Sequence, residues 1–108
     1  MPRTRTVHRT FAALADPTRI DIVTRLSRGS ATVSELAEPF AMSLRAVLKH
    51  VSALEDAGLV RTVKNGRARR CELERERFDD ASHWIDQVRQ RWERRIDRLE
   101  DYLKETQP

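Results

Sequence analysis

Residues 44–60 read LRAVLKHVSALEDAGLV, which is the most informative stretch of the chain. Three apolar residues recur at spacings of four and three, which places them on one buried face of a helix: Val47, Val51 and Leu54. Three polar or basic residues share the opposite face of that helix: Arg45, Lys49 and Ser52. Gly58 is expected to end the helix in a left-handed conformation, and Leu59 begins an extended segment.

The segments before this helix carry clear start and stop signals. Asp16 and Pro17 are suited to the N-cap and first turn of one helix. Thr32 and Glu35 form a capping box at the start of another, which must end before Pro39. Together with residues 44–57 this second helix predicts a helix-turn-helix over about residues 32–57. Residues 1–6 are expected to form a frayed basic arm, followed by a short amphipathic helix.

Two short strands and a long helix follow. Leu59–Val63 and Ala68–Leu73 are predicted strands, and Asn65-Gly66 between them is the strongest two-residue hairpin signal. From Phe78 to Glu105 apolar residues step by three or four, which predicts one helix. The predicted fold is mainly α with a small β-hairpin. It is a single winged helix-turn-helix domain over residues 1–108, with a wing at about 59–74 and a C-terminal dimerisation helix at about 78–105.

Composition favours a polyanionic partner and argues against several other classes. The formal net charge is +4, and residues 60–77 carry seven basic and three acidic side chains. The three glycines form no nucleotide-binding pattern, and no catalytic arrangement is visible, so an enzyme is not expected. One cysteine excludes an intramolecular disulfide. With no membrane-spanning apolar run and no secretory signal, the expected location is the cytoplasm.

Three segments resemble bacterial ArsR-type winged helix-turn-helix regulators. These are FAALADPTRIDIVTRL at 11–26, TVSELAEPFAMSLRAVLKHVSALEDAGLV at 32–60 and KNGRARRCEL at 64–73. The tail DDASHWIDQVRQRWERRIDRLEDYL at 79–103 resembles one metal-independent branch of that family. The resemblance covers about residues 8–103 and implies a homodimer that represses transcription by binding operator DNA.

The chain departs from this family at two points in the predicted recognition helix and lacks its thiol ligands. Arg45 stands where members often carry Pro, and Leu48 stands where they often carry Ser. Residues 34–38 lack the paired cysteines of the metal sensors. On the last helix Asp79, His83 and Asp86 share one side, and a solvated polar face is favoured there over a metal site. No metal ion or cofactor is therefore expected.

The candidate DNA contacts fall into two groups, because a helix can read base edges and a wing can hold the backbone. The base-facing candidates are Ser43, Leu44, Arg45, Leu48 and Lys49. Packing of Leu44 and Leu48 on the flank, with Arg45 contacting only phosphate, remains an alternative. The wing candidates, suited to phosphate or minor-groove contact, are Lys64, Asn65, Arg67 and Arg69.

The predicted dimer interface combines the first and last helices. Its members are apolar residues with little else in the chain to cover them: Val7, Phe11, Leu14, Ile85, Val88, Trp92, Ile96, Leu99 and Leu103. Trp84 and Tyr102 are expected to contribute to interface or core. Cys71 is expected to face the core, and His50 either touches a phosphate or packs on the flank of its helix.

The predicted function is that of a homodimeric, sequence-specific DNA-binding transcriptional regulator, expected to repress from an inverted-repeat operator. One alternative is a ligand- or metal-responsive sensor of the same family, whose effector the sequence does not identify. Another is a winged-helix module that binds a protein. The basic faces of the helix and wing disfavour this last alternative, since the core of a protein interface is depleted in charge.

Overall fold

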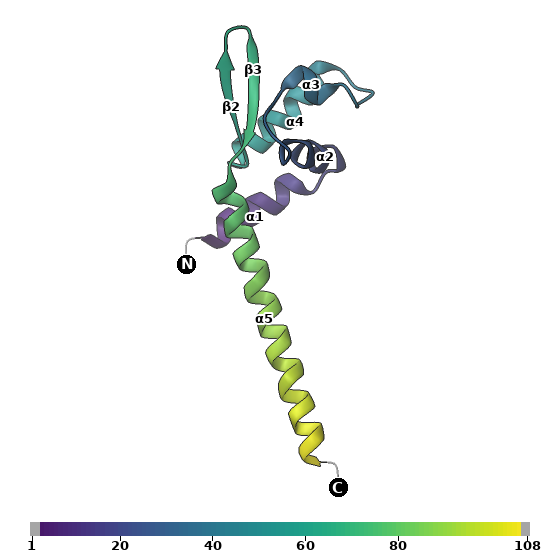
Figure 1. Ribbon diagram of the computed structural model, residues 1–108, viewed down its shortest axis with the longest axis vertical. Coiled ribbons are helices and arrows are strands. Elements are labelled where there is room, and N and C mark those ends of the chain that lie inside the picture. Colours follow the sequence, from purple (N-terminus) through teal and green to yellow (C-terminus); the bar gives the residue numbers. More distant parts are fainter. Residues whose placement is uncertain (1–2, 107–108) are drawn as a thin grey trace.

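The computed structural model describes residues 3–106, with side chains from residue 6 onward, as five helices and three short strands (Figure 1). In chain order the described elements are α1 (Arg3–Leu14), α2 (Pro17–Leu26), β1 (Ala31–Thr32), α3 (Val33–Ala37), α4 (Leu44–Asp56), β2 (Val60–Asn65), β3 (Ala68–Leu73) and α5 (Arg75–Thr106). The molecule measures 73 × 31 × 21 Å, because α5 projects far beyond the other elements.

The predicted helix caps are confirmed. Asp16 Oδ1 accepts the backbone N–H groups of Thr18 and Arg19 at 2.9 and 3.2 Å. Thr32 Oγ1 accepts the N–H of Glu35 at 3.1 Å, and the Glu35 carboxylate accepts the N–H of Thr32 at 3.0 Å. This second bond, which favours the charged carboxylate, lowers the pKa of Glu35. Both α2 and α3 therefore begin where their own sequence satisfies free N–H groups of the first turn.

Gly58 ends α4 as predicted. Its φ is +78°, and its N–H donates to the carbonyl of Glu55 at 2.9 Å. The N–H of Leu59 donates to the carbonyl of Leu54 at 3.0 Å, which completes a Schellman motif. A side chain in this left-handed conformation would be strained, and a Cβ at this position would lie 2.7 Å from Nε of Arg77. The tight turn directs the chain from α4 into the hairpin.

The sheet differs from its prediction in two ways. It has three antiparallel strands in the order β1-β3-β2, and the two-residue strand β1 pairs Ala31 with Cys71. The hairpin loop consists of Gly66 and Arg67, because Asn65 pairs with Ala68. The expectation of an Asn-Gly loop was wrong by one residue: the cross-strand register places Gly66, with φ of +66°, first in the loop.

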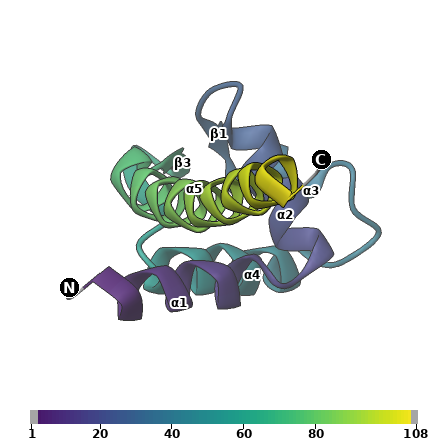
Figure 2. The same ribbon diagram turned by 90° about the horizontal axis from the view of Figure 1, so that it is seen from below.

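The N-terminal segment also differs from expectation. Residues 3–6 belong to α1 instead of a frayed arm, and residues 1–2 lie outside the described residues. α1 packs against α5 and α4, as Figure 2 shows from below, with Val7 and Thr10 buried. Burial of this face stabilises the helix through tertiary packing, which propensity alone does not reveal. The last helix begins at Arg75, three residues before the prediction.

The core lies between the middle helices and the sheet. Its largest fully buried apolar side chains come from α2, α3, α4 and the segment entering the hairpin: Ile22, Leu36, Leu54, Leu59, Val47 and Val51. α5 adds only its first turns, through Phe78 and Ala81. The rest of α5 keeps an apolar stripe exposed: Trp92, Ile96, Leu99, Tyr102 and Leu103. The fold class is therefore the predicted winged helix-turn-helix with a long C-terminal helix.

Candidate nucleic-acid interface

The N-terminal half of α4, here called the recognition helix, presents a polar and basic face. Ser43 caps the helix, with its Oγ accepting the N–H of Ala46 at 3.1 Å. Arg45 and Lys49 are exposed, and neither side chain has a hydrogen-bond or ion-pair partner within residues 6–106. Leu44 is 54% exposed. These four side chains are therefore available to a ligand that lies along the start of the helix.

Leu48 behaves differently from its neighbours. It is half-buried and packs against the core, whereas Leu44 is exposed. Both leucines were predicted to face DNA bases, but they differ in exposure in the structure. Part of the Leu48 side chain therefore packs on the flank of the helix, as the alternative expected, and Leu44 keeps about half of its surface exposed.

The wing, residues 60–73, carries basic side chains in two different environments. Arg61 is paired with Glu72 at 3.0 Å, and Arg70 Nε donates to Ser30 Oγ at 3.1 Å. The predicted contact residues are all exposed, and they have no hydrogen-bond or ion-pair side-chain partner in the described part of the chain: Lys64, Asn65, Arg67 and Arg69. Positive charge that protein carboxylates do not neutralise therefore gathers at the tip of the wing.

One hollow joins the two groups of candidate residues. Leu44 and Leu48 of the recognition helix line one side, and Arg67 and Arg69 of the wing line the other, around a volume of about 280 Å³. Its remaining lining is Ala68 of the wing together with the start of α3 and its N-cap, residues 32–34. Figure 1 shows the β2–β3 hairpin standing beside α3 and α4. Residues about 20 positions apart in the sequence thus border one continuous surface.

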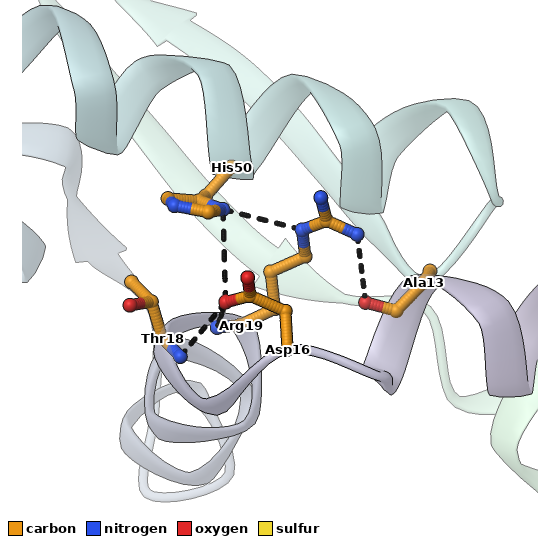
Figure 3. A network of polar contacts seen from close by, with 5 residues as sticks. All are labelled: Ala13, Asp16, Thr18, Arg19 and His50. Carbon is orange, nitrogen blue, oxygen red and sulfur yellow. Dashed lines mark hydrogen bonds and ion pairs between the residues drawn. The ribbon is translucent and has the colours of Figure 1, made fainter.

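His50 lies in the recognition helix but its ring is held by α2 (Figure 3). Its Nδ1 accepts the Nε–H of Arg19 at 3.2 Å and lies 3.9 Å from Oδ1 of Asp16. Of the two alternatives for His50, phosphate contact or packing on the flank of its helix, the structure therefore shows packing. Its partners there are the polar side chains of Arg19 and Asp16. The role of Arg19 was not predicted, although residues 16–19 lie within one of the stretches that carry the family resemblance.

The candidate metal and redox residues do not form a site. Cys71 is fully buried, as predicted, and burial raises the pKa of its thiol. Within residues 6–106 no group of three or more His, Cys, Asp or Glu side chains is placed to hold a metal ion. Asp79, His83 and Asp86 are exposed on α5.

No helix among the described residues is long and apolar enough to span a bilayer.

The predicted dimer residues divide into buried and exposed sets. Val7 is 6% exposed and is already covered within the protomer, and Leu14 and Val88 are half-buried. Six members keep large exposed apolar surface: Phe11, Ile85, Trp92, Ile96, Leu99 and Leu103. Phe11 packs edge-on against Trp84, which links the exposed surfaces of α1 and α5.

Curated relatives of this chain are regulators of transcription. Residues 14–63 match the protein family described as a helix-turn-helix domain. A probable mercury resistance operon repressor of Streptomyces lividans is 39% identical over 62 residues, which are 57% of this chain and 50% of that protein. The arsenical resistance operon repressor of Staphylococcus xylosus is 34% identical over 73 residues, covering 68% of this chain and 70% of that protein. The chain therefore spans half the length of the first relative.

A solved structure extends the likeness to nearly the whole fold. The crystal structure of an ArsR family transcriptional regulator superposes with a TM-score of 0.78 and 48% sequence identity, covering 83% of this chain and 93% of that one. These relatives are regulators and not enzymes. The recognition helix, the wing and the similarity to these regulators agree, and the chain belongs to the ArsR family of helix-turn-helix transcriptional regulators.

Proposed function

We propose that this protein is a homodimeric repressor that binds an inverted-repeat operator through the recognition helix and the wing. One observation carries the proposal: Arg67 and Arg69 of the wing border the same hollow as Leu44 and Leu48 of α4. The exposed basic residues of α4, Arg45 and Lys49, directly follow these two leucines in the helix. Phosphate backbones supply most of the affinity of DNA-binding proteins, and they need cations that protein carboxylates have not already neutralised. Arg45, Lys49, Arg67 and Arg69 meet this requirement.

The two parts of the surface suit different parts of a duplex. The recognition helix would lie in the major groove, where Arg45 and Lys49 can donate to O6 and N7 of guanine and Leu44 can contact a thymine methyl group. The wing would follow the backbone or the adjacent minor groove, with Arg67 and Arg69 contacting phosphates. The helix would therefore select the sequence, and the wing would add affinity for any duplex.

The proposed dimer rests on the exposed stripe of α5. Ile96, Leu99 and Leu103 leave much of their apolar surface in water, although burial is worth roughly 25 cal/mol per Å². A second copy of the same helix presents the same stripe, so a twofold pair covers both. Two copies of the recognition helix would then enter successive major grooves about 34–36 Å apart, which requires an inverted repeat.

We further propose that operator binding needs no metal ion. The two curated relatives are named for mercury and arsenical resistance, and thiolate ligands are typical of sites for soft metals. Here the sole thiol, that of Cys71, is buried and its pKa is raised. Dialysis against a chelator should leave operator affinity unchanged, and a large change on adding stoichiometric zinc to metal-free protein would favour the sensor alternative.

Selection of bound fragments from genomic DNA by the purified protein tests the proposal. We expect enrichment of fragments with an inverted repeat upstream of a transcription unit, and an affinity that falls steeply with salt as counterions are released. The protein-binding alternative makes the opposite prediction, because an apolar protein contact changes little with salt. If no fragment were enriched over competitor DNA at physiological salt, DNA recognition would be the wrong function.

A further inference from the structure

The segment Ala15–Arg19, sequence ADPTR, holds a polar network beside the recognition helix (Figure 3). Asp16 caps α2 through its Oδ1, which fixes the first turn of that helix. Arg19 extends from the same turn toward α4 and is partly buried. The proposed DNA contacts use neither residue, so the network has a different role from the exposed basic surface.

One guanidinium group connects three helices. Arg19 Nε donates to Nδ1 of His50 in α4 at 3.2 Å, and Arg19 Nη1 donates to the carbonyl of Ala13 in the last turns of α1 at 3.2 Å. The backbone of Arg19 belongs to α2. A change in the bond to His50 therefore alters how α4 is held against both α1 and α2.

This bond specifies the protonation state of His50. A guanidinium group can only donate hydrogen bonds, so Nδ1 of His50 must be the unprotonated nitrogen of a neutral ring. A protonated imidazole donates from both nitrogens. Gain of a proton would remove the acceptor for Arg19 and leave two cations facing each other.

The other charged groups around the ring are few. Asp16 faces Nδ1 from α2 at 3.9 Å, and both side chains are partly exposed. α1 contributes Arg9, which donates to the carbonyl of Asp56 near the far end of α4. Within the described residues, α3 and β2, which also pack on α4, place no charged group in hydrogen-bond or ion-pair contact with the ring. A protonated His50 would therefore turn to Asp16, whose Oδ1 already caps α2.

We propose that Arg19 and neutral His50 are positioning residues, which hold the recognition helix in the orientation that binds the operator. The inference rests on the proposed DNA-binding function. Protonation of His50 replaces the bond to Arg19 with a competing attraction to Asp16, and operator affinity falls because fewer molecules hold the competent orientation. Histidine is the side chain whose charge ordinarily changes between pH 5 and 8, so the test compares operator binding across this range.

The readout is the ratio of affinities for the operator and for a scrambled duplex, measured by fluorescence anisotropy at constant salt. Between about pH 7.5 and pH 5.5 the wild-type ratio should fall by about fivefold, the size expected from loss of one hydrogen bond. The added positive charge alone would raise affinity for any duplex and leave the ratio unchanged. The ratio thus separates positioning from simple electrostatics.

Variants assign the effect to the proposed contact. In His50→Asn the amide oxygen can replace Nδ1 as acceptor and cannot gain a proton, so the ratio should be near wild type and independent of pH. In Arg19→Lys one ammonium group replaces a fork of donors, so the ratio should be low even at about pH 7.5. His8 and His83 are exposed, and His8→Asn and His83→Asn should keep the wild-type profile.

Nitrogen NMR of the imidazole rings tests the contact without DNA and keeps the proposal falsifiable if a variant fails to fold. His50 should be the tautomer with its proton on Nε2 at neutral pH. The other tautomer would overturn the proposal, as would a wild-type ratio that does not change with pH or a change that persists in His50→Asn. If the wild-type protein discriminated no duplex from its scrambled control at any pH, the proposed function would fail and this inference with it.

Discussion

The ring of Phe11 in α1 meets the indole of Trp84 in α5 edge to face, with ring centroids 5.6 Å apart and planes inclined at 64°. Both side chains remain more than a third exposed. The pair therefore fastens the first helix to the last while leaving apolar surface at the point where a second copy would dock.

A double-mutant cycle should show that this pair stabilises the protein. Edge-to-face pairs contribute about 0.5–1.5 kcal/mol beyond the area they bury. Phe11→Leu, Trp84→Leu and the double variant should thus give a coupling energy of that size in urea unfolding at one fixed protein concentration. Strict additivity of the two single changes would mean that the rings lie together without stabilising the fold.

The outer half of α5 should control the oligomeric state. Light scattering of the wild type at micromolar concentration should give twice the chain mass of 12.6 kDa. Leu99→Asp places a charge in the exposed stripe but far from the core, so the variant should be a folded monomer. Gln90→Asp, nearly opposite the stripe at 100° per residue, is the matched control and should stay dimeric. A wild-type protein that stays monomeric would contradict the account of the stripe.

Cys71 should be unreactive in the folded protein. Its side chain is fully buried, and burial raises the thiol pKa, so little thiolate is present near neutral pH. Iodoacetamide at about pH 8 should label the unfolded chain and spare the native one. Because the pKa of the Cys71 thiol is raised in the folded protein, burial of the neutral thiol stabilises the fold fully at pH values below the ordinary thiol pKa. This stabilisation is lost as the pH rises through the raised pKa of the folded protein. Rapid labelling of the native protein would place the thiol at the surface.

Local signals in the sequence determined most of the secondary structure. The caps at Asp16, Thr32 and Ser43 and the stop at Gly58 are each complete within a few residues, so reading the chain locally was sufficient. Strand β1 was missed because two residues carry no periodicity, and its existence depends on pairing with β3. The observed hairpin loop lies one residue later than the predicted Asn65-Gly66 loop. The pairing register, with Val60 opposite Leu73, defines which residues form the loop, and the Asn-Gly dipeptide alone does not.

The candidate site likewise has features that local sequence predicts and features that only tertiary packing creates. The exposed basic residues of α4 and the wing were predicted, because helical and strand periods place them opposite apolar neighbours. That Leu44 and Leu48 of α4 border one hollow with Arg67 and Arg69 of the wing depends on the tertiary structure. The partner of His50 could not be predicted, since Arg19 lies 31 residues away and only the packing of α2 on α4 brings them together. From the sequence, phosphate contact and packing were both open for His50, and the contact with Arg19 distinguishes them.

Two variants test whether α4 and the wing bind DNA: Arg45→Ala and Arg67→Ala. Their affinities are measured for the operator and for a scrambled duplex over a series of salt concentrations. Arg45→Ala should lose about 1–3 kcal/mol on the operator and little on the scrambled duplex, because the recognition helix reads bases. Arg67→Ala should weaken both equally and make the salt dependence shallower by about one unit of slope. Arg28→Ala removes an exposed charge at the end of α2 and should change neither affinity. If Arg45→Ala and Arg67→Ala both bound the operator as the wild type does, the surface formed by α4 and the wing would not be where this protein binds DNA.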